Sequence, residues 1–580
     1  MANRTPHFDA KIQALLDTVQ PGPRTCRLTG EAWELTSAHV QMYRKFQVPP
    51  LDISPNAVWK WLAYFDSGYQ FWWNRHAETG EPVLTFHHPA SGVRVLPDAE
   101  WHARDFSSLT YPYDPSRPFF DQMREFEKQV PFLATYNLKE PEASTAFVSL
   151  GDKRSQFVIA SSTTDCFFSN GSFGSEQSFL LFLTDNASQC HETVHCSRLF
   201  RCRYARESHG CIDSAFLFDC RNCKNCFGAT NKRNREYMFL NEQLTKEEYE
   251  RRVAAIDLGS RAVVAQWKEA FERLLREQAV WPESFSLKAE NSTGEYLNGA
   301  TDCTDCFYAA DATAENAYCA WSFGVSQGNA FCWGPANARD TYLCVTTPKS
   351  SGSKFCYRCM GADGCEYCIQ CADCRFCFGC IGLKRKEYCM FNVQYSEEEY
   401  WRKVDELKCS MLERGEYGHF FPTAFATCYV PENGAALWCG ATPGDLARLG
   451  GNAFDPNAEG ATVKTAFDPS AMRSVSDIPD SIGDLGDDWA GVPIYDAEAK
   501  RSFSFLKHEI ELYRALRIAP PNRHFIPRFI EAATAGQAVA FEKRACANCS
   551  KPLTVSACPR YPDRRIYCRE CYLSHIEQNG

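Results

Sequence analysis

Several features that define common protein classes are missing from this sequence. No apolar run follows Met1, because residues 1–20 are polar and partly helical in pattern, so we expect no secretory signal peptide. No stretch of 18 apolar residues occurs that could cross a membrane. There is no glycine-rich phosphate loop and no serine–histidine–aspartate set with a recognisable nucleophile context. These absences predict a cytoplasmic protein without a membrane partner, and they argue against the commonest nucleotide-binding and hydrolase classes.

Cysteine is the residue in excess, with 31 among 580 residues. In a chain without a secretory signal the thiols stay reduced, so we expect them to be buried or to bind metal rather than to form disulfides. The length predicts three or four domains. The net charge of −10 argues against a protein that coats nucleic acid.

The cysteines follow a regular spacing. Seven of them recur at a near-constant interval, and from 365 to 380 a cysteine stands at every third position. A short period with small apolar residues in one phase predicts a narrow parallel β-solenoid, whose coils of about 12 residues stack ~4.8 Å apart around the cysteines. The seven are Cys306, Cys319, Cys332, Cys344, Cys356, Cys368 and Cys380.

The predicted solenoid is duplicated. Residues 220–253 align without gaps on residues 371–404, with 14 identities in 34 positions. Each copy ends in a capping box, at Thr245 and at Ser396, which predicts the start of a helix. The first of these helices is expected to break near Gly259 and to continue to about residue 278.

The predicted fold class is mixed and β-rich: a duplicated short-rung parallel β-solenoid with inserted helices, flanked by small α/β modules of which the last is a zinc ribbon. Similar residues in the two flanking modules lie 470 positions apart, as Tyr43 and Tyr513 do. The predicted domains are an aromatic-rich α/β module without zinc (24–135), the first solenoid half with its helix (140–280), the second half with its helix (290–415), an acidic linker (430–499), and a helix with the zinc ribbon (500–575).

The last module carries two C-x-x-C pairs, at 546–549 and 568–571, and this spacing is typical of a structural zinc site. Each pair forms one turn with two thiolates on the same side, and the two turns together complete a tetrahedral site for one zinc ion. Buried free thiols are the alternative. The predicted ligands are Cys546, Cys549, Cys568 and Cys571.

The matching positions of the first module, at the same offset along the chain, do not supply such a ligand set. They are His76, Thr79, Asp98 and Trp101, so we expect that module to fold without metal. Cys26 stands alone in a CRLTGE segment that is similar to HAETGE at 76–81. We interpret it as the remnant of a lost metal-binding turn.

The block from Cys365 to Cys380 has two other interpretations, an iron–sulfur cluster and a zinc site inside the solenoid. The ferredoxin run C-x2-C-x2-C-x3-C-P is not met, because Cys380 comes one residue early and Ile381 replaces the proline. In the sister copy Ala229 takes the place of Cys380. Core packing tolerates that replacement and a ligand set does not, so we favour buried thiols and keep the metal alternatives open.

His191, Glu192 and His195 form the pattern H-E-x-x-H, the zincin signature of metallopeptidases. That chemistry needs both histidines on one face of a helix, with the glutamate polarising a zinc-bound water. Here the motif lies between Cys190 and Cys196, in phase with the predicted coils, and no helical apolar pattern surrounds it. We predict a solenoid rung with two surface histidines and keep a metal- or thiol-dependent enzyme as an alternative.

Positive charge gathers in the last module, where residues 541–572 hold seven Lys or Arg and three Asp or Glu. Tyrosines in the same segment would stack on bases, so a nucleic-acid-associated function is a second alternative. A solvated surface that pairs with the acidic linker would give the same pattern. The candidate residues are Arg560, Arg564, Arg565 and Arg569.

Longer segments carry a family resemblance. They are DSAFLFDCRNCKNCFG (213–228), REYMFLNEQLTKEEY (235–249), ELYR with the following PP (511–521), CANC with YCRECY (546–572), YRKFQVPP (43–50), RVLPDAEWHARDF (94–106) and YDPSRPFFDQM (113–123). Over most of its length the chain resembles uncharacterised cysteine-rich zinc-ribbon proteins of candidate-phyla bacteria, sometimes labelled CaiB/BaiF family. The resemblance implies the fold and the zinc ribbon, and no activity. The CoA-transferase chemistry of that label belongs to an α/β enzyme, whereas this sequence predicts a cysteine solenoid.

The function that we predict is that of a non-enzymatic, zinc-stabilised interaction or scaffold protein, because repeat solenoids mostly use their long regular surfaces to bind. One structural zinc is the cofactor expected. The expected partner is a macromolecule, a protein in preference to a nucleic acid, which the sequence does not identify.

Overall fold

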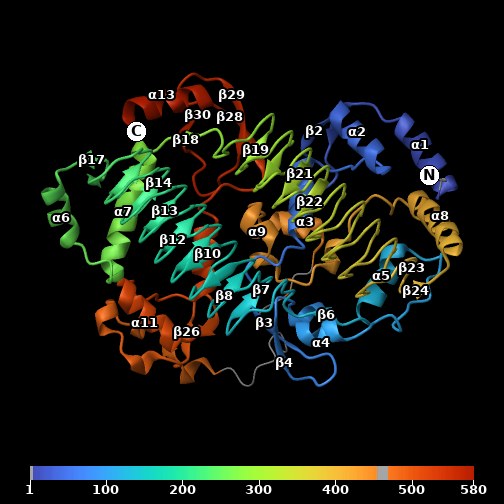
Figure 1. Ribbon diagram of the computed structural model, residues 1–580, viewed down its shortest axis with the longest axis horizontal. Helices are drawn as coiled ribbons and strands as arrows, with labels where there is room; N and C mark the ends of the chain where they lie inside the picture. The colour runs from blue at the N-terminus through green and yellow to red at the C-terminus, as the bar shows by residue number, and fades with distance from the viewer. Residues whose placement is uncertain (1–3, 452–453, 455–467) are drawn as a thin grey trace. The chain divides into compact units, whose positions relative to one another are not determined.

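The computed structural model describes residues 4–451, 454 and 468–580 (Figure 1). The chain forms two compact units. The first unit comprises residues 1–134, 284–463 and 539–541, and the second comprises residues 135–283, 464–538 and 542–580. Each unit therefore combines one half of the repeat with one flanking module. The second half belongs with the N-terminal module and the first half with the C-terminal module, a grouping that the order of the sequence does not predict.

The described residues form 13 α-helices and many short strands, so the fold is mixed α and β. The helices of the first unit are α1 (Pro6–Asp17), α2 (Ser37–Phe46), α3 (Pro55–Ala63), α4 (Asp98–Ala103), α5 (Phe119–Glu127), α8 (Glu397–Glu413), α9 (Gly434–Trp438) and α10 (Pro443–Leu449). Those of the second unit are α6 (Lys246–Ala254), α7 (Arg261–Gln278), α11 (Lys507–Leu516), α12 (Phe525–Ala533) and α13 (Arg569–Asn579).

Most strands have two to four residues. Outside the two long ladders described below, they are β1 (Gly22–Thr25), β2 (Ala32–Leu35), β3 (Trp72–Arg75), β4 (Pro82–Thr85), β5 (Val95–Leu96), β6 (Phe132–Leu133), β7 (Thr145–Phe147), β8 (Gln156–Ile159), β9 (Ser162–Thr164), β10 (Phe173–Glu176), β17 (Glu242–Gln243), β18 (Trp281–Pro282), β23 (Cys389–Met390), β24 (Val393–Gln394), β25 (Arg473–Ser474), β26 (Ile494–Asp496), β27 (Arg501–Phe503), β28 (Phe541–Ala545), β29 (Pro552–Ser556) and β30 (Ile566–Tyr567).

A row of parallel strands forms the centre of the second unit, and we call it the first ladder (Figure 1). Each strand pairs with the next one along the chain at a constant offset, as His191 pairs with Arg203 and Arg203 with Ala215. Isolated bridges repeat the same register between these strands, as at Ser197 and His209. The cysteine period is therefore the register of the ladder. Its strands are β11 (Phe179–Phe182), β12 (His191–Val194), β13 (Arg203–Arg206), β14 (Ala215–Phe218), β15 (Phe227–Thr230) and β16 (Met238–Phe239).

The second ladder lies in the first unit and follows the same rule. Where the interval between cysteines is one residue longer, the offset between paired residues is also one residue longer, as between Ala317 and Ala330. Further along the chain the offset is again that of the first ladder, as between Asp363 and Arg375. Beyond β22 it continues as isolated parallel bridges. Its strands are β19 (Gly294–Glu295), β20 (Cys306–Phe307), β21 (Ala317–Ala320) and β22 (Ala330–Trp333).

Every third residue of a ladder points inward, which explains the spacing of the dense cysteine block. Cys368 is fully buried. Its thiol donates to the carbonyl oxygen of Glu366, two residues earlier, at 3.5 Å and lies 3.4 Å from that of Cys377, nine residues later. Residues with positive φ also recur at every third position, as at Asn222 and Asn225. The cysteines of the block fill the interior, and among the described residues the groups able to hold a metal do not include them.

Two predicted helix starts are confirmed. The Thr245 hydroxyl accepts a hydrogen bond from the Glu248 backbone N–H at 3.2 Å, and Ser396 does the same for Glu399 at 3.3 Å. The predicted break is also present, because α6 ends at Ala254 and α7 begins at Arg261.

The two flanking modules share a local plan. Helices α2 and α11 begin at Ser37 and Lys507, and α3 and α12 begin at Pro55 and Phe525, so both pairs keep the offset that the sequence predicts. Both α2 and α11 end in a left-handed residue, Gln47 and Arg517, whose N–H donates to the carbonyls three and four residues back. A β-hairpin follows in each module, β3–β4 and β28–β29.

The range 430–499 is not a featureless segment where it is described. Residues up to 451 form α9 and α10, and residues from 468 onward form 3-10 turns and the three-stranded sheet β25–β26–β27. The rest of the predicted acidic linker, residues 452–453 and 455–467, lies outside the described residues.

Candidate metal centre and ligand pocket

The four predicted metal ligands come together in the second unit. Cys546 and Cys549 lie in the turn between β28 and β29, while Cys568 caps α13 and Cys571 lies in its first turn. Their four sulfur atoms all lie within 4.8 Å of one another. The backbone N–H of Cys568 donates to the sulfur of Cys546 at 3.3 Å, and the Asn548 amide donates to Cys571 at 3.3 Å. This arrangement could hold one metal ion.

Hydrogen bonds and ion pairs occupy the matching place in the first unit. The Nδ1 atom of His76 accepts from the N–H groups of Glu78 and Thr79 at 3.2 Å, and its Nε2 atom lies 3.2 Å from the Glu100 carboxylate. Arg104 forms ion pairs with both Glu78 and Glu100. Of the four matching positions only the His76 side chain takes part in this cluster, and Glu78, Glu100 and Arg104 lie beside those positions in the sequence. Cys26 is buried in a third hairpin of the same kind, β1–β2.

The four-cysteine module is attached both to the segment that follows α7 and to the first ladder. Strand β30 pairs in parallel with β18, where the Trp281 N–H donates to the Arg565 carbonyl at 2.8 Å. The Tyr572 hydroxyl of α13 donates to the fully buried Asp219 carboxylate, and Arg233 reaches both groups, at 3.0 Å from Asp219 and 2.5 Å from Tyr572. A metal bound by the four cysteines would therefore stabilise the module that packs against this side of the ladder.

The predicted nucleic-acid residues are mostly engaged in contacts within the unit. Arg564 is buried and donates to the Ser556 carbonyl at 2.6 Å, so it is not a surface residue. Arg560 pairs with Glu272 at 3.3 Å, and Arg565 donates to the Glu277 carbonyl at 2.7 Å. Arg569 is exposed at the start of α13. Nucleic-acid binding stays a prediction, and these contacts do not favour it.

The H-E-x-x-H motif lies on strand β12 rather than on a helix. Glu192 and His195 both have positive φ, so the backbone turns twice within the motif. The His195 ring lies 2.9 Å from the Glu207 carboxylate, and Glu192 pairs with Lys268 of α7 at 2.7 Å. The prediction of two surface histidines is wrong. His191 and His195 are 6% and 8% exposed, because α7, α12 and the residues around them cover this side of the ladder.

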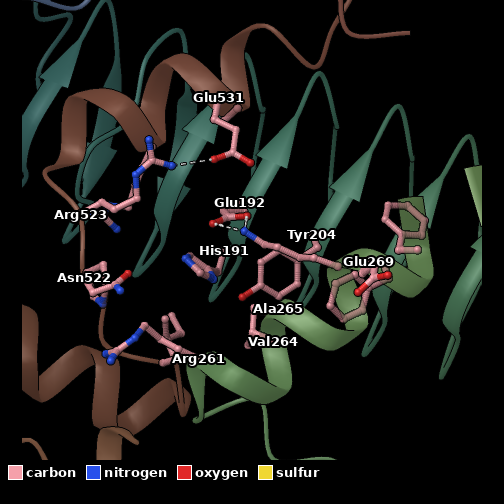
Figure 2. A pocket seen from close by; sticks show the side chains of 18 of the residues that line it. His191, Glu192, Tyr204, Arg261, Val264, Ala265, Glu269, Asn522, Arg523 and Glu531 are labelled. Carbon is pink, nitrogen blue, oxygen red and sulfur yellow. Dashed lines mark hydrogen bonds and ion pairs between the residues drawn. The ribbon is translucent and has the colours of Figure 1, made fainter. Parts of the chain in front are cut away.

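A pocket of about 600 Å³ opens over this motif, entirely within the second unit. Three elements form most of its lining: the ladder strands β12–β14, helix α7, and the segment from Ile518 to Ala532 that follows α11 (Figure 2). Asp480, Tyr513 and Arg560 complete it. The ladder contributes His191, Glu192 and Tyr204. Sequence reasoning missed this pocket, because its three walls are far apart in the chain. Two local signals fall on its lining, the H-E-x-x-H motif and the proline pair at 520–521 after α11.

Electrostatic contacts differ from one part of the pocket to another. Burial lowers the pKa of His191 to about 3, so its imidazole is neutral at neutral pH. Burial raises the pKa of Glu192, but the Lys268 ammonium and neighbouring cations outweigh it and lower that pKa to about 2. Glu272 accepts from Arg206 at 3.2 Å and from Arg560 at 3.3 Å. The pocket thus combines paired charges with a neutral imidazole.

Comparison with known proteins gives little further guidance. No protein-family model and no curated protein matches the chain. A crystal structure of a candidate acetyltransferase from Desulfovibrio desulfuricans G20 is similar at 8% sequence identity and a TM-score of 0.10, over 41% of this chain and 61% of that chain. A likeness this weak carries no argument. Within the described ranges, no helix combines the length and the apolar character that a membrane span requires.

Proposed function

We propose that the protein is a zinc-stabilised interaction or scaffold protein without enzymatic activity. In this proposal the two ladders are halves of a duplicated short-rung β-solenoid, and a zinc ribbon is fixed to the first half. The observation that carries it is the group of four cysteine sulfurs within 4.8 Å of one another. Four thiolates in two turns are the ligands that structural zinc prefers, with no open position for substrate.

The rest of the structure supports a structural role for the metal. The ribbon is attached to the ladder through the buried Asp219, Arg233 and Tyr572, so the ion would hold a wall in place. The H-E-x-x-H motif has a strand geometry that does not present both histidines to one ion. The resemblance to cysteine-rich zinc-ribbon proteins belongs to the same proposal, as does a protein partner on the regular ladder surfaces.

Metal analysis tests the proposal directly. The purified chain should contain about one zinc per molecule, and Cys571→Ser should lose most of it. Cys409→Ser is the matched control, because Cys409 is a partly exposed cysteine of α8 in the other unit and should leave the zinc content unchanged. Absence of zinc in the unaltered protein, or an equal loss in both variants, would contradict the structural zinc site.

The interaction role has its own test. A tagged chain purified from its native cells should carry a protein partner at a fixed ratio by quantitative mass spectrometry, and Cys571→Ser should reduce that ratio. Recovery of the chain alone at all salt concentrations would refute the scaffold role and leave the zinc site untouched.

A further inference from the structure

We propose that the pocket of the second unit binds a small organic acid, whose carboxylate contacts Arg528 and whose apolar body lies against Tyr204 and Val264 (Figure 2). This inference goes beyond the proposed function, which assigns no small ligand. The volume of about 600 Å³ falls in the range of roughly 300–1,000 Å³ usual for such sites. Apolar atoms make up most of the lining surface, and charged side chains supply much of the rest, as an amphipathic ligand requires.

The pocket has more positive charge than its own carboxylates neutralise. Among the described residues, Glu192, Glu272 and Glu531 each form an ion pair with a lysine or an arginine. The lining holds six cations and five carboxylates, and two of the cations, Arg261 and Arg528, form no ion pair in the described chain. The Asp480 carboxylate still acts on Arg261 from a longer distance. Arg261 instead donates to three backbone carbonyls, those of Ile478, Pro479 and Pro520.

Arg528 is the other lining cation without an ion pair in the described chain, and Tyr513 and Glu509 are the groups that act on it. Its Nε atom is buried and has no hydrogen-bond partner among the described residues. Its guanidinium lies 5.3 Å from the ring centroid of Phe168, which fixes its plane. The acid that acts on it is Glu509, and burial raises the pKa of that carboxyl to about 7, so its charge is incomplete at neutral pH. A planar guanidinium with spare donors binds a carboxylate in a bidentate manner.

Two polar groups of the pocket lining make no hydrogen bond within the described chain. The Nδ1 atom of His191 is buried and makes no hydrogen bond within the described residues. For the Tyr204 hydroxyl, likewise, no hydrogen bond is found in the described chain, and the Tyr204 ring faces Lys268 at 5.0 Å. A buried polar group without a partner is unfavourable, and a hydrogen bond from a ligand hydroxyl or carboxylate would remove that penalty.

The geometry favours a carboxylate over a phosphate. A phosphate site at a helix start needs free backbone N–H groups. At the start of α7 these groups are already taken, because Ala262 donates to Asp480 at 3.1 Å and Val263 to Ser260 at 3.4 Å. One uncompensated guanidinium matches one carboxylate charge.

Fluorescence competition tests the proposal on the full, zinc-loaded chain. Anilinonaphthalene sulfonate, an amphipathic anion, should bind saturably with increased emission. Octanoate should displace it at concentrations at least tenfold lower than octanol or octylamine, which have the same apolar body without the carboxylate. No saturable binding, or equal displacement by octanol, would overturn the proposal. Displacement by inorganic phosphate below the octanoate concentration would overturn the choice of carboxylate.

Variants locate the site. Ala265→Trp places an indole in the pocket from an exposed position of α7 and should abolish octanoate competition. Gln266→Trp is the matched control, since it adds the same ring to the same helix at a residue that does not line the pocket. Arg528→Gln should weaken octanoate at least tenfold and leave octanol unchanged, with an unfolding midpoint measured alongside. Equal octanoate affinity in Ala265→Trp and Gln266→Trp would show that the ligand binds elsewhere and refute the proposal.

Discussion

The buried carboxylate of Asp219 illustrates how much a single residue contributes to this protein. It is fully buried and accepts from Arg233 at 3.0 Å, from the Asn231 amide at 2.8 Å and from the Tyr572 hydroxyl. Both carboxylate oxygens accept hydrogen bonds, one at Oδ1 and three at Oδ2, and Arg233 compensates the charge. The same network joins the ladder to α13, and its loss would affect both.

Removing that charge should destabilise the protein strongly. Asp219→Asn leaves the partly buried guanidinium of Arg233 without its counter-charge, and removing one partner of a buried ion pair typically costs about 3–5 kcal/mol. Urea denaturation should show the loss as a lower midpoint of the second unit. Asp213→Asn is the control, because Asp213 also has positive φ and pairs with Arg201 at 2.6 Å, but on the surface. Its effect should stay within about 1 kcal/mol, and equal effects would contradict the account.

Residues whose role follows from local spacing could be predicted from the sequence. The two C-x-x-C turns and the caps at Thr245 and Ser396 are of this kind, since each depends on neighbours a few positions away. The partner of Asp219 could not be predicted, because Tyr572 lies 353 residues further along the chain. Arg564 is a second example. Its charge suggested a surface position, but it is buried, and its burial depends on residues far away in the sequence.

At the scale of elements, a three-residue step governs both ladders. One position points inward, and the residue two positions later has positive φ, as Cys223 and Asn225 show. The step explains why the H-E-x-x-H pattern has no helical meaning here, since residues four apart fall on different sides of the turn. Positive φ strains most side chains, and asparagine and glycine relieve it.

The step makes deletions far more damaging than substitutions at the same residue. Deleting Asn222 moves every later residue out of phase, so polar side chains would enter the interior and Cys223 would leave it. Asn222→Gly keeps the phase and the positive φ, and should change the stability by at most about 1 kcal/mol. Thermal unfolding followed by circular dichroism should show a cooperative transition for Asn222→Gly and none near the same temperature for the deletion.

An intact transition in the deletion variant would mean that the ladder can slip by one residue, contrary to its buried interior. The period itself could be predicted from the sequence because cysteine marks the inward phase so densely. The pocket could not, since its walls come from a ladder, a helix and a turn that no single periodic pattern connects.

At the scale of the whole molecule, the two flanking modules share a local plan but are stabilised by different interactions. The C-terminal module gathers four thiols, and the N-terminal module uses His76, Glu100 and Arg104 at the matching place. Metal binding stabilises only the fold that holds the metal, in proportion to the logarithm of its free concentration. The two units should therefore respond differently to chelation.

Chelation should weaken the second unit alone. With a strong zinc chelator, calorimetry should show one transition moving to lower temperature and another unchanged. Limited proteolysis with mass spectrometry should give early cleavage within residues 542–580 and none within the hairpin of β3 and β4. Simultaneous cleavage of both regions at equal rates would show that the N-terminal module also depends on metal.

Arg560 gives the metal centre a consequence beyond stability. It belongs to the four-cysteine module, and its guanidinium lines the pocket, where it reaches Glu272 at 3.3 Å and Glu531 at 3.7 Å. If metal binding fixes the position of this arginine, it changes the affinity of the pocket for a ligand that contacts the same side. By thermodynamic linkage, the ligand then changes the affinity for the metal by the same factor. The metal would be an effector of the pocket, and occupancy of the pocket a determinant of how tightly the protein retains its metal.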